Sequence, residues 1–486
     1  MEMTFRWYGP GQDKVTLDEI RQIPGVQGVV GCIMDIPVGE VWPTDRIKAL
    51  VDEVHAHGLT MKAIESVNIH DDIKVGLPSR DRYIENYKQT IRNLAQFGVK
   101  VICYNFMPVF DWVKSDLDYT LPDGSKTLAF VKQDIPDDPN VLLDTYSKNT
   151  NGFVLPGWEP DRLAQIKRLF EIYKDVDDAK LRENLVYFLK AIMPTCEECD
   201  VKMAIHPDDP PYSTFGLPRI IKNRADLDWL CRAVDTPYNG ITLCCGSIAE
   251  EPGNDLYAIL EEFTKRGRIH FAHVRNIKYL HPEIPGNKDF YEAPHLSCCG
   301  SLDLYRIVKI LHDNGFTGFI RPDHGRMIWG ETGRPGYGLF DRALGITYIN
   351  GLWEAVDKSE KGEQATRSAR GAGHAARLHR RDTDHAAERR LSAHDPVGEE
   401  ALPRPCQVPR PRRRAAEGAG QPHLRVEPPG AAPRLRHRPP DHPRQRRGDP
   451  ESRQRAARHA GVPRQGPHLV VRREVHLHDG QPCRHA

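Results

Sequence analysis

The first 360 residues alternate short apolar runs, rich in β-branched side chains, with longer stretches that are apolar at helical spacing. Such short runs predict buried strands, and the amphipathic stretches predict helices that cover them. The predicted strands are Thr4–Tyr8, Gly28–Ile33, Thr60–Ile64, Val99–Phe106, Val201–His206, Gly240–Cys244, Ile269–Val274 and Gly318–Asp323. The predicted helices are Pro43–His57, Arg82–Phe97, Pro160–Tyr173, Ala179–Glu197, Ala225–Ala233, Asp255–Arg266, Leu302–Asp313 and Leu339–Ala355. The alternation indicates an α/β protein with a parallel sheet.

Eight strands followed by helices in this length predict a (β/α)8 TIM barrel, and a doubly wound open sheet is the alternative. The barrel is favoured because no Gly-x-Gly-x-x-Gly follows a predicted strand. Two connections are too long for plain turns, namely about Met107–Glu159 after strand 4 and Arg275–Ser301 after strand 7. Both follow carboxyl ends of strands, where barrels carry their active sites, so we expect lid-like loops or substrate walls. A flexible surface loop is the other interpretation.

Side chains typical of metal ligands stand at the ends of four successive predicted strands. The fifth strand ends at His206, the sixth at Cys244, the seventh near His273, and the eighth in Asp323 and His324. In a barrel these ends meet at one rim, and strand alternation places His273 and Asp323 on inward faces. Two imidazoles, a thiolate and a carboxylate suit a divalent transition metal, zinc included. One strand histidine alone is more often structural, but four such residues on adjacent strand ends favour a site.

Composition divides the chain near residue 360. Residues 361–486 contain 26 Arg and one Lys against six Asp and eight Glu, a net charge of +13, whereas the residues before them carry −12. The same stretch has no Phe, Tyr, Trp, Ile, Met or Asn. Without such side chains, folding cannot offset roughly 1–2 kcal/mol of backbone entropy per residue. We predict a catalytic barrel over residues 1–356 and a disordered tail rich in Arg, Pro, His and Ala over 357–486.

Several classes of protein are disfavoured by what the sequence lacks. No stretch approaches the ~18 consecutive apolar residues of a membrane span. The start, MEMTFRWYG, has neither the charged nor the apolar region of a signal peptide. We therefore expect a cytoplasmic protein without a membrane partner, and we leave open whether it forms a homo-oligomer. In a reducing compartment the nine cysteines before residue 360 are expected to be thiols or ligands rather than disulfides.

The motifs HPDDPP, CCGS, HFAHVRN, RPDHGRMIWGE and GRPGYGL, in this order, closely resemble those of the mannonate dehydratase family. The resemblance runs from the start of the chain to about Gly351–Glu354. It implies a metal-dependent (β/α)8 lyase that dehydrates D-mannonate to 2-dehydro-3-deoxy-D-gluconate in hexuronate (glucuronate) catabolism. It implies Mn2+ or Fe2+ as the cofactor. The residues that it implies are the metal ligands His206, Cys244, His273 and Asp323, already selected from the strand ends, and the catalytic residues His324 and Tyr337.

Dehydrating a sugar acid means taking the proton beside the carboxylate and expelling hydroxide from the next carbon. The first step builds a second negative charge, which a metal with open coordination positions can stabilise. A His, with an ordinary pKa near ~6.5, can act as base or acid, and a Tyr, near ~10, as a proton donor. We expect His324 and Tyr337 to divide the two transfers, in an order that the sequence leaves open. Tyr337 comes from the resemblance alone, because a Tyr in a Gly-rich loop more often simply packs.

Three further residues are candidates for contact with the small sugar-acid substrate. Arg275 and Arg321 follow or end strands, and a guanidinium fork matches a carboxylate. For Arg321, an ion pair deep in the barrel is an equal alternative. Asn105, at the end of the fourth strand, is a candidate to bind a substrate hydroxyl.

Two other functions are weighed against the dehydratase. A metal-dependent sugar isomerase or epimerase uses the same proton abstraction without loss of hydroxide. A nucleic-acid-binding protein would use the 26 Arg of the tail, but the tail has no aromatic side chain for base stacking, which disfavours nucleic acid as a partner. The tail is largely made of residues with GC-rich codons, so we interpret it as the out-of-frame product of a frameshift near residue 360.

Overall fold

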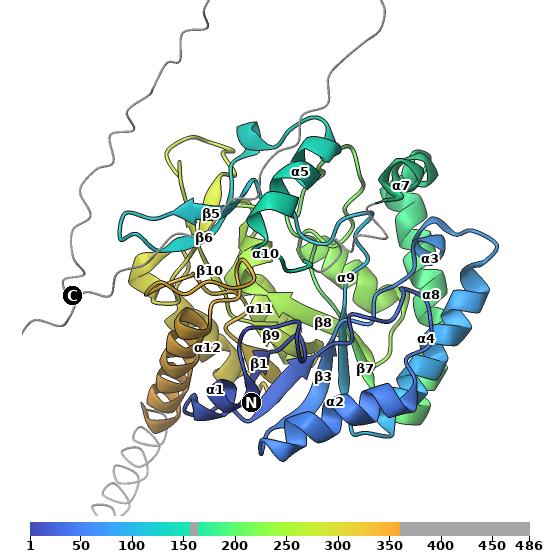
Figure 1. The fold of residues 1–486 in the computed structure, drawn as a ribbon, viewed down its shortest axis with the longest axis horizontal. Coiled ribbons are helices and arrows are strands. Elements are labelled where there is room, and N and C mark those ends of the chain that lie inside the picture. The colour runs from blue at the N-terminus through green and yellow to red at the C-terminus, as the bar shows by residue number, and fades with distance from the viewer. Residues whose placement is uncertain (156–163, 360–486) are drawn as a thin grey trace, which may run out of the picture. The chain divides into compact units, whose positions relative to one another are not determined.

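Eight parallel strands close into a barrel in the computed structural model, which describes residues 1–155 and 164–359 (Figure 1). Around the barrel the strands follow chain order, and the last one closes it by pairing with the first. The (β/α)8 prediction is confirmed. The strands are β1 (Glu2–Arg6), β2 (Gly28–Gly31), β3 (Thr60–Glu65), β4 (Val101–Tyr104), β7 (Lys202–Ile205), β8 (Asn239–Cys244), β9 (Ile269–His273) and β12 (Phe319–Arg321).

All eight predicted strands are present, but several end earlier than their apolar runs. The run Val99–Phe106 contains only β4, for example, although Val99 and Phe106 are both buried. Residues that enter and leave a barrel strand still pack into the core, so an apolar run overstates the length of the strand.

Helices follow the barrel strands and cover the barrel. The helices are α1 (Leu17–Gln22), α2 (Thr44–Ala56), α3 (Asp71–Val75), α4 (Arg80–Ala95), α5 (Pro139–Asn149), α7 (Ile166–Tyr173), α8 (Asp178–Cys199), α9 (Arg224–Ala233), α10 (Cys245–Ala249), α11 (Leu256–Lys265) and α12 (Leu304–Asp313), followed by a helix over residues 339–359. Side chains of Asp177, Asp255 and Asp303 cap the first turns of α8, α11 and α12. The sequence did not predict α1, α3, α5 or α10, and α1, α3 and α10 are too short to show a helical period.

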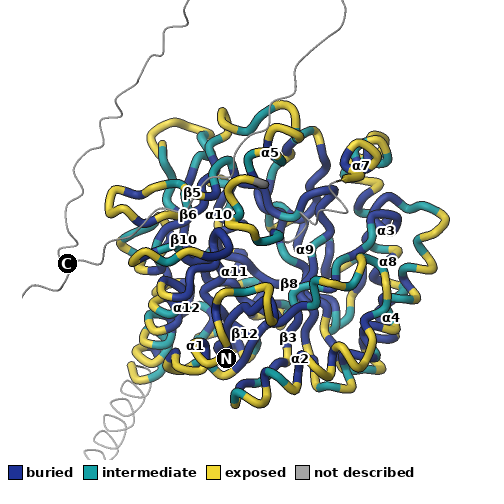
Figure 2. Tube along the Cα trace, in the orientation of Figure 1, coloured by how far each residue is buried: buried dark blue, intermediate teal, exposed yellow. Residues whose placement is uncertain are grey.

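The core has an outer and an inner part. The larger cluster lies between the strands and the helices, and it includes Ile241 of β8 and Leu260 of α11. A small cluster contains alternate residues of several strands, among them Ala63, Cys103 and Phe271. Figure 2 shows the strands buried and the outer faces of the helices exposed. Because the barrel is filled with side chains, its functional groups are confined to an end.

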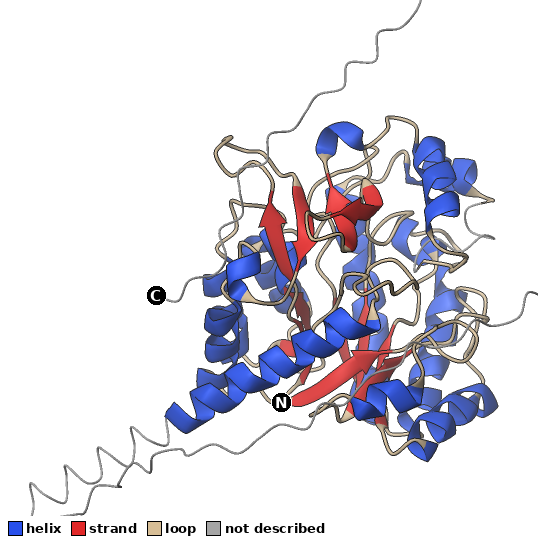
Figure 3. Ribbon diagram, turned by 60° about the vertical axis from the view of Figure 1, so that its left-hand side comes forward, coloured by secondary structure: helices blue, strands red, loops and turns tan. Residues whose placement is uncertain are grey.

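The two long connections form one small antiparallel sheet. Its strands, in spatial order, are β10 (Asn276–Tyr279), β11 (Phe290–Ala293), β6 (Lys126–Phe130) and β5 (Asp116–Thr120), with the 3-10 turns η1 (Lys132–Asp134) and η2 (Ser297–Cys299) nearby in sequence. In Figures 1 and 3 these strands lie together beyond one end of the barrel. The connections are therefore structured walls rather than plain loops, and their role as lids stays a prediction.

The last described helix continues to residue 359, four residues past its predicted end at Ala355. The start of the predicted helix Pro160–Tyr173 and the tail from residue 360 onward, including its predicted disorder, lie outside the described residues. Within residues 1–155 and 164–359, no helix has both the length and the apolar character needed to cross a membrane.

Candidate metal centre and active site

The register of the barrel brings the predicted ligands to one rim. Cys244 at the end of β8 is the Cα partner of His273 at the end of β9, and His273 is in turn the partner of Arg321 at the end of β12. His206 follows the last residue of β7 and donates its backbone N–H to the carbonyl of Tyr104 at 2.7 Å. Four parallel strands thus deliver their terminal side chains to adjacent positions.

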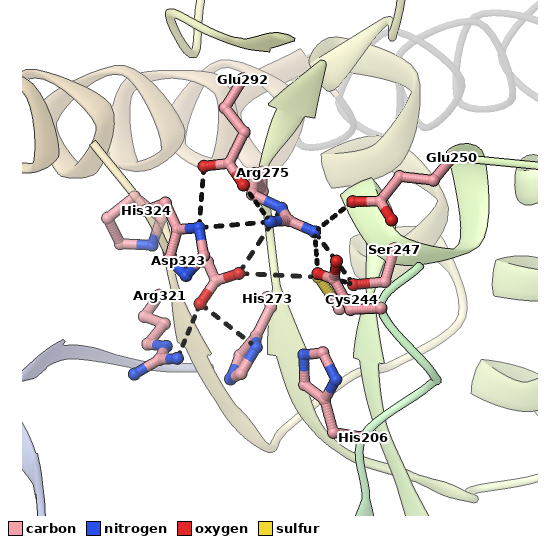
Figure 4. Close-up of polar contacts among 12 residues, drawn as sticks. His206, Cys244, Ser247, Glu250, His273, Arg275, Glu292, Arg321, Asp323 and His324 are labelled. Atoms are coloured by element: carbon pink, nitrogen blue, oxygen red, sulfur yellow. Dashed lines mark hydrogen bonds and ion pairs between the residues drawn. The ribbon is translucent and has the colours of Figure 1, made fainter. Parts of the chain in front are cut away.

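Donor atoms of the four predicted ligands, His206, Cys244, His273 and Asp323, all lie within 4.8 Å of one another (Figure 4). The Cys244 Sγ is 3.6 Å from Asp323 Oδ2, and His273 Nδ1 is 3.4 Å from Asp323 Oδ1. Burial alone would raise the pKa of Asp323, but the neighbouring His324, His273 and arginines hold it well below its ordinary value. The Asp323 carboxylate is therefore ionised and able to act as a ligand.

The backbone at Asp323 departs from the strand geometry assumed from the sequence. The strand β12 ends at Arg321, and Asp323 has a positive φ of 57°. Strand alternation therefore does not explain where its carboxylate points. A left-handed conformation, which Asp tolerates better than most residues, turns the side chain back to accept a 2.7 Å hydrogen bond from Arg321 Nη2. Asp323 therefore joins the other predicted ligands because of its backbone conformation and not because of strand alternation.

The donor chemistry of this cluster fits a divalent transition metal. Both ring nitrogens of His273 are buried and have no hydrogen-bond partner among the described residues. Carboxylate oxygens of Asp323 and Glu65 lie 3.4 Å and 3.5 Å from them without forming a hydrogen bond, and a metal ion bound to one nitrogen would satisfy it. A mixture of imidazole, thiolate and carboxylate donors suits Mn, Fe or Zn better than Ca or Mg.

A second group, Glu65, Cys103 and His273, shares the same histidine. Burial raises the pKa of the Cys103 thiol well above its ordinary value, so this thiol keeps its proton. Glu65 already accepts a 2.9 Å hydrogen bond from Arg321. The group is therefore a poorer ligand set than the four residues at the rim.

A pocket opens beside the four-residue cluster. Several of its lining residues were not selected from the sequence, including Arg6 and Glu65, which stand at the carboxyl ends of β1 and β3. Glu65 directly follows the predicted strand Thr60–Ile64, so the strand-end criterion would have found it, whereas Arg6 lies inside the predicted strand Thr4–Tyr8. The lining residues are Arg6, Glu65, Ser66, Cys103, Tyr104, Asn105, Asp111, Trp112, His206, Asp209, Asp323, His324 and Tyr337.

The predicted catalytic pair meets in this pocket. The rings of His324 and Tyr337 lie 5.0 Å apart, and a backbone bridge between Gly325 and Tyr337 holds the Gly-rich loop beside the strand end. His324 Nδ1 faces away from the pocket toward Glu292 Oε2 at 2.7 Å. Burial raises the pKa of Tyr337 well above its ordinary value, so its phenol stays protonated.

Arg275, selected from the sequence as a candidate substrate contact, is not among the residues that line the pocket. Its guanidinium is buried and donates to Asp209 at 2.8 Å, Ser247 at 2.9 Å, Glu250 at 3.1 Å and Glu292 at 2.5 Å. Figure 4 shows it between Glu250 and Glu292, beside the ligand cluster. Sequence spacing could not reveal this, because the partners come from three separate segments.

Arg321 and Asn105 occupy different positions relative to the pocket. Arg321 is buried, donates to Glu65 at 2.9 Å and to Asp323 at 2.7 Å, and does not line the pocket. This arrangement matches the ion-pair alternative in the barrel. Asn105 lines the pocket and accepts a 3.3 Å hydrogen bond from the backbone of Met107. Within the described part of the chain, Asn105 is thus the one of the three predicted substrate contacts that lines this pocket.

Comparisons with known proteins agree on one family. Residues 1–363 match the sequence model of a family described as D-mannonate dehydratase (UxuA). Mannonate dehydratase of Lactococcus lactis subsp. cremoris is 68% identical over 361 residues, which are 74% of this chain and 100% of that protein. The Thermotoga maritima enzyme of the same name is 59% identical over 362 residues, 74% of this chain and 99% of that protein. The crystal structure of mannonate dehydratase from Streptococcus suis serotype 2 has a TM-score of 0.66 at 47% identity, covering 74% of this chain and 96% of that one.

Proposed function

This chain belongs to the D-mannonate dehydratase family, and from that premise we propose that it dehydrates D-mannonate to 2-dehydro-3-deoxy-D-gluconate in hexuronate catabolism. The observation that carries the proposal is the convergence of a four-residue ligand cluster with His324 and Tyr337 at one pocket. The family model matches residues 1–363, a range that includes every residue of this site.

His206, Cys244, His273 and Asp323 would hold the metal, which we propose to be Mn2+ or Fe2+. When bound, a divalent metal supplies positive charge where the substrate carboxylate gains negative charge. Cys244 ligates best as a thiolate and must stay reduced, which supports a cytoplasmic location.

His324 and Tyr337 carry the two proton transfers in this proposal. With Nδ1 turned to Glu292, His324 has Nε2 left to take the proton on the carbon beside the carboxylate. The phenol of Tyr337 is protonated and donates its proton to the hydroxyl that leaves from the next carbon. The carbon–oxygen bond breaks, water forms, and the resulting enol becomes the 2-keto acid. Positioned proton transfer of this kind contributes about 10²–10⁴-fold to the rate.

The remaining predicted residues take supporting places. Asn105 would bind a substrate hydroxyl from the pocket wall. Arg321 holds Asp323 and Glu65 in place, and Arg275 holds Glu292. Arg6, a pocket-lining cation that the sequence did not single out, adds positive charge for the anionic substrate.

The test is incubation of the Mn2+-loaded protein with D-mannonate, followed by an assay for a 2-keto-3-deoxy acid. Product should form, stop when a chelator removes the metal, and return when Mn2+ is restored. The alternative, an isomerase or epimerase on the same barrel, is not favoured by the family match. If the loaded protein leaves mannonate untouched but isomerises an aldose, the dehydratase assignment is wrong.

A further inference from the structure

The ring of His324 is held from behind by a buried carboxylate. Its Nδ1 lies 2.7 Å from Glu292 Oε2, while the other oxygen, Oε1, accepts a hydrogen bond from Arg275 Nη1 at 2.5 Å. Glu292 and Arg275 are 4% and 1% exposed. Figure 4 shows Glu292 in contact with both Arg275 and His324, which also lie beside each other. Each oxygen of the carboxylate thus has its own partner.

Arg275 cannot turn away from Glu292. Its other terminal nitrogen is bound by Asp209, Ser247 and Glu250. The backbone of Gly246 packs so closely that a Cβ there would lie 2.3 Å from Arg275 Nε. Because a guanidinium only donates hydrogen bonds, the atom of residue 292 that faces it must be an acceptor.

These contacts assign the tautomer of His324. Burial alone would raise the pKa of Glu292, but the Arg275 guanidinium beside it brings the pKa below its ordinary value, so the carboxyl is ionised and can only accept. If Nδ1 carried no hydrogen, its lone pair would face a lone pair of the oxygen 2.7 Å away, and the two would repel each other. Nδ1 therefore carries the hydrogen and donates it to Glu292. A protonated Nδ1 cannot also accept from Arg275 Nη1, 3.2 Å away.

We propose that Glu292 is a positioning residue that keeps a hydrogen on Nδ1 of His324, so that Nε2 is the nitrogen that accepts a proton at the substrate pocket. This inference rests on the proposed dehydratase function, in which Nε2 takes the proton. A carboxylate behind a catalytic imidazole fixes both its tautomer and its ring orientation.

The second long connection, between β9 and α12, positions Glu292 beside Arg275. Arg275 follows β9, and the chain then runs through β10 and returns as β11, where Glu292 is the register partner of Ile277. The backbone carbonyl of Glu292 also accepts from Thr127 Oγ1 of β6 at 2.8 Å. The small sheet therefore fixes Glu292 from both sides, beside the arginine that orients its carboxylate.

Glu292→Gln is the sharpest test because it keeps size and shape. Arg275 requires an acceptor, so the amide oxygen must face it, and the amide NH2 must then face His324 Nδ1. Nδ1 has to accept, which moves the proton to Nε2. An equivalent carboxylate-to-amide change in a serine protease triad costs about 10⁴-fold in kcat, and we expect a loss of about 10³–10⁴-fold here with KM and Mn2+ content unchanged.

Glu292→Asp and Glu250→Gln are the matched variants. Aspartate is shorter but still accepts from both partners, so it should retain more activity than the isosteric Gln. Glu250 binds the same guanidinium without contacting His324, and burial raises its pKa well above the ordinary value, so an amide resembles its protonated form. Glu250→Gln should keep most of its kcat. If Gln at 292 is tolerated better than Asp, the role is steric and the proposal is wrong.

The tautomer of His324 can be measured directly, without an activity assay. In ¹⁵N-histidine spectra of the zinc-loaded full chain, His324 signals are identified by their absence in His324→Asn. We expect a protonated Nδ1 in the unchanged protein and a protonated Nε2 in Glu292→Gln. The same tautomer in both proteins would overturn the proposal. If the unchanged protein fails to dehydrate mannonate, the function is wrong, while the spectra still decide the role of Glu292.

Discussion

Position 246 has room only for glycine, because the side chain of Arg275 packs against its backbone. It is the second residue of α10, and a Cβ there would meet the guanidinium of Arg275, whose two terminal nitrogens are bound by carboxylates and Ser247. Gly246→Ala should therefore destabilise the fold by about 1–3 kcal/mol, as overpacking of a core does. It should also lower kcat through the displaced Arg275. Urea unfolding and steady-state kinetics check this.

The matched control is Gly253→Ala, where a Cβ would find only Glu251 Oε1, at 3.6 Å. This variant should behave as the unchanged protein does. Equal stability of the two alanine variants would show that Arg275 has room to move, contrary to its contacts.

A substitution at Tyr337 tests whether its phenol is the proton donor. Tyr337→Phe removes only the phenolic oxygen, so the packing of its ring against His324 is kept. We expect kcat to fall by about 10²–10⁴-fold while the melting temperature and Mn2+ content stay the same. Tyr87→Phe, a buried tyrosine outside the pocket that donates to the Val67 carbonyl at 3.3 Å, is the comparison. A Tyr337→Phe enzyme as fast as Tyr87→Phe would remove Tyr337 from the chemistry.

At this scale the sequence was informative where a residue type and a strand end coincide. His206, Cys244, His273 and Asp323 could be selected because parallel strands deliver their ends to one rim, and the structure brings the four together. Glu292 could not be selected. It lies in a short strand of a connection, and its partner His324 is 32 residues away with no local pattern linking them.

Among the elements, β9 carries a histidine that faces away from the ligand cluster. Burial, together with Lys202 and Arg268, lowers the pKa of His270 from 6.5 to about 3. The folded protein thus keeps His270 neutral, while the unfolded chain protonates it below its ordinary pKa. The free energy of unfolding should fall as the pH drops below about 6.5, and His270 should account for about 2 kcal/mol of that fall between pH 7 and pH 5.

His270→Asn removes the titrating group and keeps a polar side chain. Its loss of stability between pH 7 and pH 5, measured by denaturant unfolding in the same excess of Mn2+, should be about 2 kcal/mol smaller than that of the unchanged protein. Comparing the two losses cancels the effect of pH on metal binding. Equal losses would mean that His270 is protonated in the folded state too.

The barrel elements could be predicted because each strand and helix shows its own period. The small sheet could not. Its strands are four or five residues long, and β5 has the sequence DLDYT, which reads as a polar loop. The pairing of Phe130 with Phe290 joins segments about 160 residues apart, so nothing local announces it. Length alone marked these connections as unusual.

At the scale of the whole molecule, the family match indicates which part of the chain is needed for the reaction. It ends at residue 363, and 361 residues of this chain cover all of the Lactococcus lactis relative. A chain that ends at Lys361 should therefore keep the melting temperature of the barrel and its kcat. A large loss of either would show that the basic tail contributes to the fold or the site.

Two further experiments address the positive charge of the tail and the origin of its sequence. Removing a net +13 should weaken retention on immobilised polynucleotide at low salt. Unchanged retention would leave no support for a nucleic-acid role. Resequencing the gene tests the frameshift interpretation, which a clean reading frame through residue 360 would refute.

The central claim is that this site removes water from a sugar acid, and proton NMR in D2O tests it most directly. With Mn2+-loaded protein, the signal of the proton beside the carboxylate of D-mannonate should disappear. A 2-keto-3-deoxy acid carrying one deuteron at the third carbon should replace it, because the enol left after loss of hydroxide takes that hydrogen from solvent. Unchanged mannonate, or a product that keeps every hydroxyl and gains deuterium only at the second carbon, would contradict the account.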